Sequence, residues 1–126
     1  KIINETKKIL SNEKLLISAT AARVPITKCH SESVMIELQK DSTKKEILKT
    51  LQTSKGVVVK NNDKSNNYPM PMFASDKDDV FVGRIREDVS LKNVFHLWIV
   101  SDNLRKGAAT NTVQIADYLV DNNLIF

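Results

Sequence analysis

The segment Val94-Phe-His-Leu-Trp-Ile-Val100 decides the fold, because it is apolar at odd and even positions alike. A strand with two apolar faces is covered on both sides, so this segment is predicted to be a central strand of a sheet. A second apolar strand is predicted over Val80–Arg86. The polar residues 87–93 between the two predict a turn, so the strands are expected to pair as a hairpin.

Further strands are predicted on either side of this hairpin. Leu15–Val24 is predicted to be a strand that Pro25 ends, and Ser31–Gln39 alternates apolar and polar residues as a half-buried strand does. Val57–Val59 is short and apolar, and residues 60–78 carry the Asn and Pro pairs of a long loop. The sheet is therefore expected to be largely antiparallel or mixed.

Three helices are predicted. The first covers residues 2–10, and the second follows Thr43-Lys-Lys-Glu46, which has the spacing of a capping box, and stops at Lys55-Gly56. Asp102 is expected to cap the third, over residues 104–122, whose apolar stripe comprises Ala109, Val113, Ala116 and Val120. The sum is an α+β fold, a two-layer sandwich of one sheet with helices on one face, forming a single domain over residues 1–126.

Composition narrows the function classes. The 126 residues carry a net charge of +4, but 19 basic and 15 acidic side chains are interleaved, which disfavours a nucleic-acid partner. No apolar run approaches the roughly 20 residues that span a bilayer, so no membrane partner is expected. The single cysteine excludes an internal disulfide, and a reducing, cytoplasmic setting is expected.

The candidate chemistry centres on Arg23 and His30, seven residues apart. A guanidinium can hold a carboxylate through two parallel hydrogen bonds, and an imidazole exchanges protons near neutral pH. The pair is typical of a site for an acidic substrate, although Arg23 alone could also be an ordinary ion-pair residue.

Other constellations are weaker. Cys29 adjoins His30, but neighbours in a strand point to opposite faces, so a thiolate–imidazole pair is disfavoured and a semi-buried thiol is expected. One Cys and two His predict no metal site. His96, in the apolar strand, is interpreted as a core or interface histidine. Gly107 with two following alanines would admit a flat ligand, but close helix packing is the favoured interpretation. No G-x-G-x-x-G motif is present.

Several segments together carry a family resemblance. In order, they are Asn4-Glu-Thr-Lys-Lys-Ile-Leu10, Arg23-Val-Pro-Ile followed by His30-Ser-Glu-Ser33, Tyr68-Pro-Met-Pro71, Val80-Phe-Val-Gly-Arg-Ile-Arg86, Leu97-Trp-Ile-Val-Ser-Asp-Asn103, Lys106-Gly-Ala-Ala109 and Asn111 to Ala116. Their order and spacing resemble the C-terminal part of the bacterial aspartate-semialdehyde dehydrogenases over nearly the whole chain. The resemblance implies the C-terminal domain of dehydrogenases similar to glyceraldehyde-3-phosphate dehydrogenase.

The resemblance also implies a reaction and a set of roles. The family reduces β-aspartyl phosphate to aspartate semialdehyde with NADPH, on the route to lysine, methionine and threonine. His30 matches the general acid/base, Arg23 the arginine that holds the substrate carboxylate, and Lys1 the lysine that contacts the phosphate. Asn103 matches a position that contacts NADP. The family domain also forms a homodimer through its sheet, and the terminal helix packs on an amino-terminal dinucleotide-binding domain.

The sequence departs from the family pattern in one large respect. The dinucleotide-binding domain, the catalytic cysteine in its Asn-Cys motif and a substrate-contacting Glu are absent, and Cys29 does not match that cysteine. We therefore expect the catalytic and dimerisation domain without its partner domain, inactive by itself and unable to bind NADP. The alternative is an oligomerisation module in which His30 and Arg23 have no catalytic role.

Overall fold

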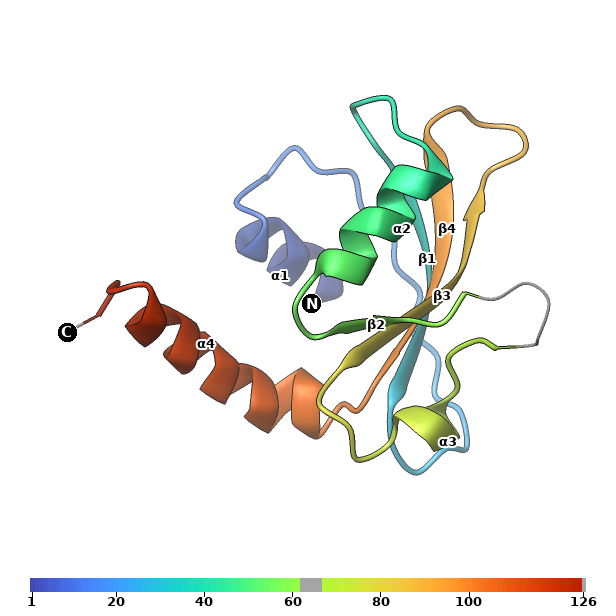
Figure 1. The fold of residues 1–126 in the computed structure, drawn as a ribbon. Helices are drawn as coiled ribbons and strands as arrows, with labels where there is room; N and C mark the ends of the chain where they lie inside the picture. The colour runs from blue at the N-terminus through green and yellow to red at the C-terminus, as the bar shows by residue number, and fades with distance from the viewer. Residues whose placement is uncertain (62–66, 126) are drawn as a thin grey trace.

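The computed structural model describes residues 1–61 and 67–125, and it has one sheet with helices around it (Figure 1). The elements in chain order are α1 (Ile2–Ile9), β1 (His30–Glu37), α2 (Lys44–Thr53), β2 (Val57–Val59), α3 (Pro71–Ala74), β3 (Val80–Glu87), β4 (Val94–Ser101), the π-helical turn η1 (Arg105–Ala109) and α4 (Thr110–Asp121). The predicted α+β class is confirmed.

The sheet has four strands in the order β1-β4-β3-β2. β4 pairs antiparallel with both β1 and β3, whereas β2 pairs parallel with β3. The mixed, largely antiparallel sheet, the β3–β4 hairpin and the central place of β4 are all as predicted. The centre of the sheet is buried because β3 and β4 each have a neighbour on both sides.

Helix α2 covers one face of this sheet, which we call the α2 face. The predicted capping box is present: Thr43 accepts a hydrogen bond from the Glu46 N–H, and the Glu46 carboxylate accepts one from the Thr43 N–H. Apolar side chains of α2 and of alternate strand positions form the larger core cluster, which includes Val82, Ile85, Phe95, Leu97, Ile36, Ile47, Leu48 and Leu51. This cluster fixes α2 against β2 and β3.

The opposite face has a smaller core. Cys29, Ala74, Phe81 and Val100 are buried together there, with Trp98 packed against them. Ala74 belongs to α3, a single helical turn with Pro71 at its start. This turn lies within the loop predicted for residues 60–78, part of which is outside the described residues.

Gly83 lets two chain segments cross β3 at close range. A Cβ at this position would lie 2.1 Å from the Lys60 carbonyl oxygen and 2.5 Å from Cδ of Pro69. Lys60 N–H donates to the Val82 carbonyl at 2.7 Å, and the Trp98 indole N–H donates to the Pro69 carbonyl at 2.9 Å. Only glycine fits here, for steric reasons and not for its backbone freedom.

The predicted strand over Leu15–Val24 is wrong. This segment has no regular secondary structure and is largely exposed, with Leu16 at 97% exposure. β1 is an edge strand, and the segment does not pair with it. A strand is stable only when a neighbour supplies hydrogen bonds, and Ala19, Ala21 and Ala22 contribute little β propensity to offset their absence.

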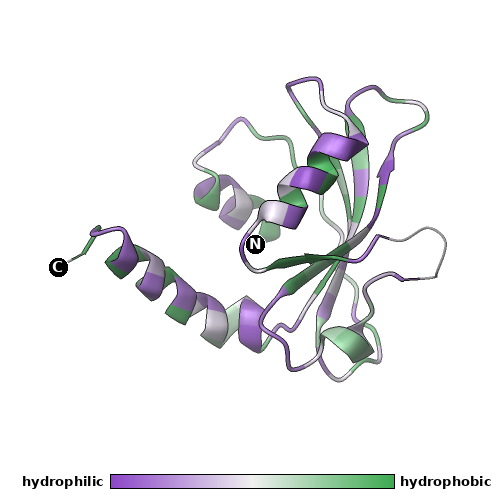
Figure 2. Ribbon diagram, in the orientation of Figure 1, coloured by the Kyte–Doolittle hydropathy of each residue, from purple (hydrophilic) through white to green (hydrophobic). Residues whose placement is uncertain are grey.

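Helices α1 and α4 contain no buried residue. α4 extends away from the sheet, and both hydrophobic and hydrophilic residues are distributed along it (Figures 1 and 2). All four residues of the predicted stripe, Ala109, Val113, Ala116 and Val120, are exposed. No described helix has the length and apolar character that crossing a membrane requires.

Candidate functional site

His30 is the first residue of β1 and is exposed. It pairs with Ser101 at the end of β4, while the next pairs are Ser31 with Val100 and Glu32 with Ile99. Ile99 packs in the cluster beneath α2, and side chains of paired residues share a face. His30 therefore emerges on the α2 face, at the end of the sheet where the chain leaves for η1 and α4.

Cys29 is buried on the other side of the chain from His30, as predicted. Its thiol donates to the Pro71 carbonyl at 3.5 Å and lies 3.6 Å from the Ser75 hydroxyl. Its backbone is left-handed, with φ of 77°. A buried thiol that faces away from His30 cannot form a thiolate–imidazole pair with it.

Asn103 lies beside this segment. Its side-chain oxygen accepts a hydrogen bond of 2.8 Å from the Cys29 N–H, across 74 residues of sequence. The structure thus brings together two of the four predicted site residues, Asn103 and His30, with Cys29 between them. No sequence signal indicated this hydrogen bond.

Asp102 holds Asn103 in place. It is 1% exposed, and its carboxylate accepts hydrogen bonds from the N–H groups of Asp76, Leu104 and Arg105. The Asp76 N–H makes the largest contribution to lowering the pKa of Asp102, and the other two N–H groups add to it against the opposing effect of burial. The N-cap of η1 is Leu104 and not Asp102 as predicted, but the Asp102 carboxylate still accepts from the first N–H groups before and within η1. It also ties the chain before β3 to the chain after β4.

The start of the terminal helix is fixed by a second carboxylate. Arg105 donates two hydrogen bonds to Asp78, at 2.7 and 2.9 Å, and the Thr110 hydroxyl donates a third at 2.6 Å. These donors lower the pKa of Asp78 to about 2, with Arg105 the larger cause. Gly107, between these residues, is exposed, and a Cβ there would make only ordinary contacts. The close helix packing interpreted for Gly107 is not what the described chain shows.

Arg23 and Lys1 are exposed. Within residues 1–61 and 67–125, the Arg23 side chain makes no hydrogen bond or ion pair, and the Lys1 side chain forms only a 3.9 Å ion pair with Glu5 one helical turn away. Neither of two hollows described below includes Arg23 or His30 in its lining. The shared site for an acidic substrate that the sequence suggests for Arg23 and His30 stays a prediction.

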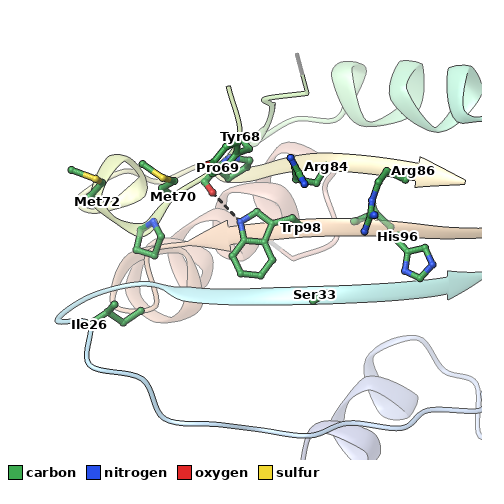
Figure 3. Close-up of a pocket in the computed structure, with 12 residues that line it drawn as sticks. Ile26, Ser33, Tyr68, Pro69, Met70, Met72, Arg84, Arg86, His96 and Trp98 are labelled. Carbon is green, nitrogen blue, oxygen red and sulfur yellow. Dashed lines mark hydrogen bonds between the residues drawn. The ribbon is translucent and has the colours of Figure 1, made fainter. Parts of the chain in front are cut away.

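A hollow of about 770 Å³ lies on the face opposite α2 (Figure 3). β3 contributes Arg84 and Arg86, β4 contributes His96 and Trp98, and β1 contributes Ser33; the remaining lining residues are Ile26, Tyr68, Pro69, Met70, Pro71, Met72 and Leu97. A second hollow of about 490 Å³ is formed by the β3–β4 turn and the chain before α2. Neither contains a residue predicted for catalysis.

His96 is a satisfied histidine, as interpreted from the sequence. Its Nε2 lies 2.7 Å from Oδ2 of Asp88. This contact is the main cause that lowers the pKa of Asp88, and the Ser90 backbone and hydroxyl and the Leu91 N–H add to it. Among the described residues, no group of three His, Cys, Asp or Glu side chains could hold a metal ion.

The comparison with protein families decides what this domain is. Residues 1–106 match the model described as "Semialdehyde dehydrogenase, dimerisation domain". The chain belongs to this family. The match covers all the elements of the sheet and ends within η1.

Full-length relatives and solved structures agree with the match. The dimerisation domain is 51% identical to the aspartate-semialdehyde dehydrogenase of Bacillus subtilis over 126 residues, which is 99% of this chain and 36% of the relative. It is 46% identical to that of Aquifex aeolicus over 125 residues, 99% of this chain and 37% of the relative. The chain therefore spans about a third of the length of these relatives.

The fold is also shared. The structure of aspartate semialdehyde dehydrogenase II from Vibrio cholerae, complexed with ASA, superposes with a TM-score of 0.88 at 36% identity and covers 95% of this chain and 35% of its own. The enzyme from Francisella tularensis gives a TM-score of 0.78 at 27% identity, over 94% of this chain and 34% of its own. The predicted family and fold are confirmed.

Proposed function

We propose that this dimerisation domain is part of a cytoplasmic NADP-dependent aspartate-semialdehyde dehydrogenase, which converts β-aspartyl phosphate to aspartate semialdehyde for lysine, methionine and threonine biosynthesis. The family match supports the proposal. The observation that carries it is the placement of His30, exposed at the end of the α2 face and beside Asn103. A proton-transfer residue must be reachable by substrate, and His30 is.

His30 is the general acid/base in this proposal. Its imidazole makes no hydrogen bond with the described part of the chain and is exposed, so it is available to a substrate. Cys29 is unsuited to be the nucleophile, because its thiol is buried and bonded to the Pro71 carbonyl. The acyl-enzyme thiolate of the family mechanism therefore comes from outside residues 1–126.

Arg23 and Lys1 are the anion-binding groups. An acyl phosphate of an amino acid presents a carboxylate, which suits the planar fork of Arg23, and a phosphate, which suits the ammonium of Lys1. The Lys1–Glu5 pair is highly exposed, at 85% and 57% of the two side chains, so it offers little competition to a phosphate.

NADP would lie near Asn103 and the exposed Gly107-Ala-Ala109 turn. These residues fit a flat ligand, because Gly107 is exposed and no large side chain follows it. When bound, the cofactor supplies the hydride. The residues of this domain contribute contact and orientation, while the phosphate cradle belongs to a dinucleotide-binding domain.

The same proposal includes a homodimer through the sheet face opposite α2. Met72 lines the hollow there together with Trp98 and is 72% exposed (Figure 3). Met35, which pairs with His96 on the same face, is 60% exposed. Exposed apolar side chains around a hollow are typical of an interface. The two faces then have separate tasks, since His30 emerges on the α2 face.

The test is His30→Ala in the full-length enzyme. Loss of a general acid/base should lower kcat by about 100-fold or more, measured by NADPH formation from aspartate semialdehyde and phosphate. Glu37→Gln, an exposed position at the far end of the same strand, is the matched control and should retain normal kcat. Unchanged turnover in His30→Ala would support the non-catalytic oligomerisation module instead.

A further inference from the structure

We propose that Asn103 is a positioning residue for His30 and acts through the backbone of Cys29. This inference rests on the acid/base role proposed for His30. The role proposed here for Asn103 differs from contact with the cofactor and depends only on contacts within this domain.

The first step is the backbone of Cys29. Its φ of 77° lies in the left-handed region, which is unfavourable for a residue with a side chain. His30 follows directly and begins β1. The direction in which the chain leaves Cys29 therefore determines where the His30 imidazole lies.

The second step is the bond that holds this conformation. The Cys29 N–H donates to the side-chain oxygen of Asn103 at 2.8 Å, in a half-buried setting. A left-handed residue persists only where its surroundings hold it, and this hydrogen bond acts on the backbone of the residue itself. The thiol contacts with Pro71 and Ser75 restrain the side chain of Cys29 but not the direction of His30.

The third step is the rigidity of the acceptor. Asn103 follows the buried carboxylate of Asp102, which accepts three backbone hydrogen bonds from two chain segments. Two residues earlier, Ser101 pairs with His30 itself. The segment that contains Asn103 is thus held rigidly beside β1, the strand that Asn103 orients. A residue that positions another must itself be rigidly held.

The role predicts a particular kinetic signature. If Asn103 acts by orienting the imidazole, its removal lowers kcat and leaves the affinity for NADP nearly unchanged. If it acts only by cofactor contact, the affinity for NADP falls and kcat at saturating cofactor is preserved.

The experiment is a double-mutant cycle in the full-length enzyme with His30→Ala, Asn103→Ala and the double variant. Asn103→Ala should lower kcat by at least about tenfold, since small misplacement of a reacting group is costly. In the His30→Ala background the same change should have less than about a twofold effect, because the two residues act as one unit. An equal effect in both backgrounds would overturn the inference, and a His30→Ala enzyme of normal kcat would instead overturn the proposed function.

Asn103→Asp is the matched variant, because its carboxylate oxygen can still accept from the Cys29 N–H. It should retain most of the kcat that Asn103→Ala loses. Hydrogen exchange of the Cys29 amide should accelerate in Asn103→Ala and stay slow in Asn103→Asp. If Asn103→Ala does not fold, Asn103→Ser enters the same cycle. A protected Cys29 amide in the variant without the acceptor would refute the inference.

Discussion

Replacing Gly83 by alanine should destabilise the domain strongly. The new Cβ would lie 2.1 Å from the Lys60 carbonyl oxygen and 2.5 Å from Cδ of Pro69, both well inside the 3.0 Å that real Cβ contacts respect. The first neighbour is backbone and the second a proline ring, so neither can rotate away. Both crossing segments must lift off β3 by close to an ångström.

The size of this destabilisation follows from the contacts that hold the two segments against β3. Overpacking of a fitted site costs about 1–3 kcal/mol. Lifting also strains the hydrogen bonds from Lys60 N–H to Val82 and from the Trp98 indole to Pro69, each worth about 1 kcal/mol. We expect a loss of roughly 3 kcal/mol in the free energy of unfolding.

Urea denaturation monitored by fluorescence measures this loss. Trp98 is the single tryptophan and its indole bonds to the displaced segment, so it reports both unfolding and local distortion. With a urea dependence of about 1–3 kcal/mol per molar, the midpoint should fall by roughly 1–3 M. The Gly83→Ala variant and the wild type must be compared at the same protein concentration, because association of the chains adds to their stability.

Gly107→Ala is the matched control for Gly83→Ala. A Cβ at Gly107 would lie 3.6 Å from Cβ of Asn103, an ordinary contact, and the residue lies in the π-helical turn η1. Removing a glycine from a helical segment should stabilise it by up to about 1 kcal/mol. The two substitutions are therefore expected to have opposite signs. A Gly83→Ala midpoint equal to wild type would show that the close crossing over β3 is wrong.

Four further predictions concern the site, the assembly and the terminal helix. Arg23→Lys in the full-length enzyme should raise KM for aspartate semialdehyde and spare KM for NADP, because an ammonium lacks the planar fork; normal substrate KM would count against the carboxylate role. Sedimentation should show a dimer that buries more than roughly 1,000 Å², and Met35→Glu should dissociate it; a wild-type monomer at tens of micromolar would refute the interface. Because Arg105 and Thr110 lower the pKa of Asp78 from 3.8 to about 2, the contribution of this carboxylate to stability is complete above pH 4 and is lost as the pH falls towards 2. Between pH 4 and pH 2, Asp78→Asn should therefore lose less free energy of unfolding than the wild type. An equal pH dependence of the two proteins would contradict the assignment. Calorimetry on residues 1–126 should detect no NADP binding, since the chain lacks a G-x-G-x-x-G loop, and micromolar affinity would overturn the assignment of the cofactor cradle to another domain.

Most of the sheet could be predicted from the sequence because its signals are local. The apolar runs of β3 and β4, the alternation in β1 and the capping box of α2 each lie within a few residues. The failure at Leu15–Val24 has the opposite origin. Whether an extended segment becomes a strand depends on a free neighbour, and no local pattern reveals which edge of the sheet is paired.

The sequence predicts members of a candidate site but not the contacts that connect them. Arg23 and His30 are chemically distinctive, and the family resemblance added Lys1 and Asn103. The hydrogen bond from Cys29 to Asn103 joins residues 74 positions apart, and it depends on the left-handed backbone of a cysteine, a residue type that rarely adopts it. Such a contact follows from the register of β1 against β4, which a single sequence does not specify.

The alternation of strand β1 explains how one small domain can serve both assembly and catalysis. Cys29 is anchored on the face that carries the hollow, and His30 emerges on the α2 face. A change at the hollow can reach His30 only through the backbone between them, and Asn103 fixes that backbone from the α4 side. Only the peptide bond between Cys29 and His30 therefore connects the face of the proposed dimer contact to the proposed acid/base. By fixing this backbone, Asn103 prevents structural changes on the opposite face from moving His30. We therefore expect dissociation of the dimer to change kcat in the Asn103→Ala enzyme but not in the wild type.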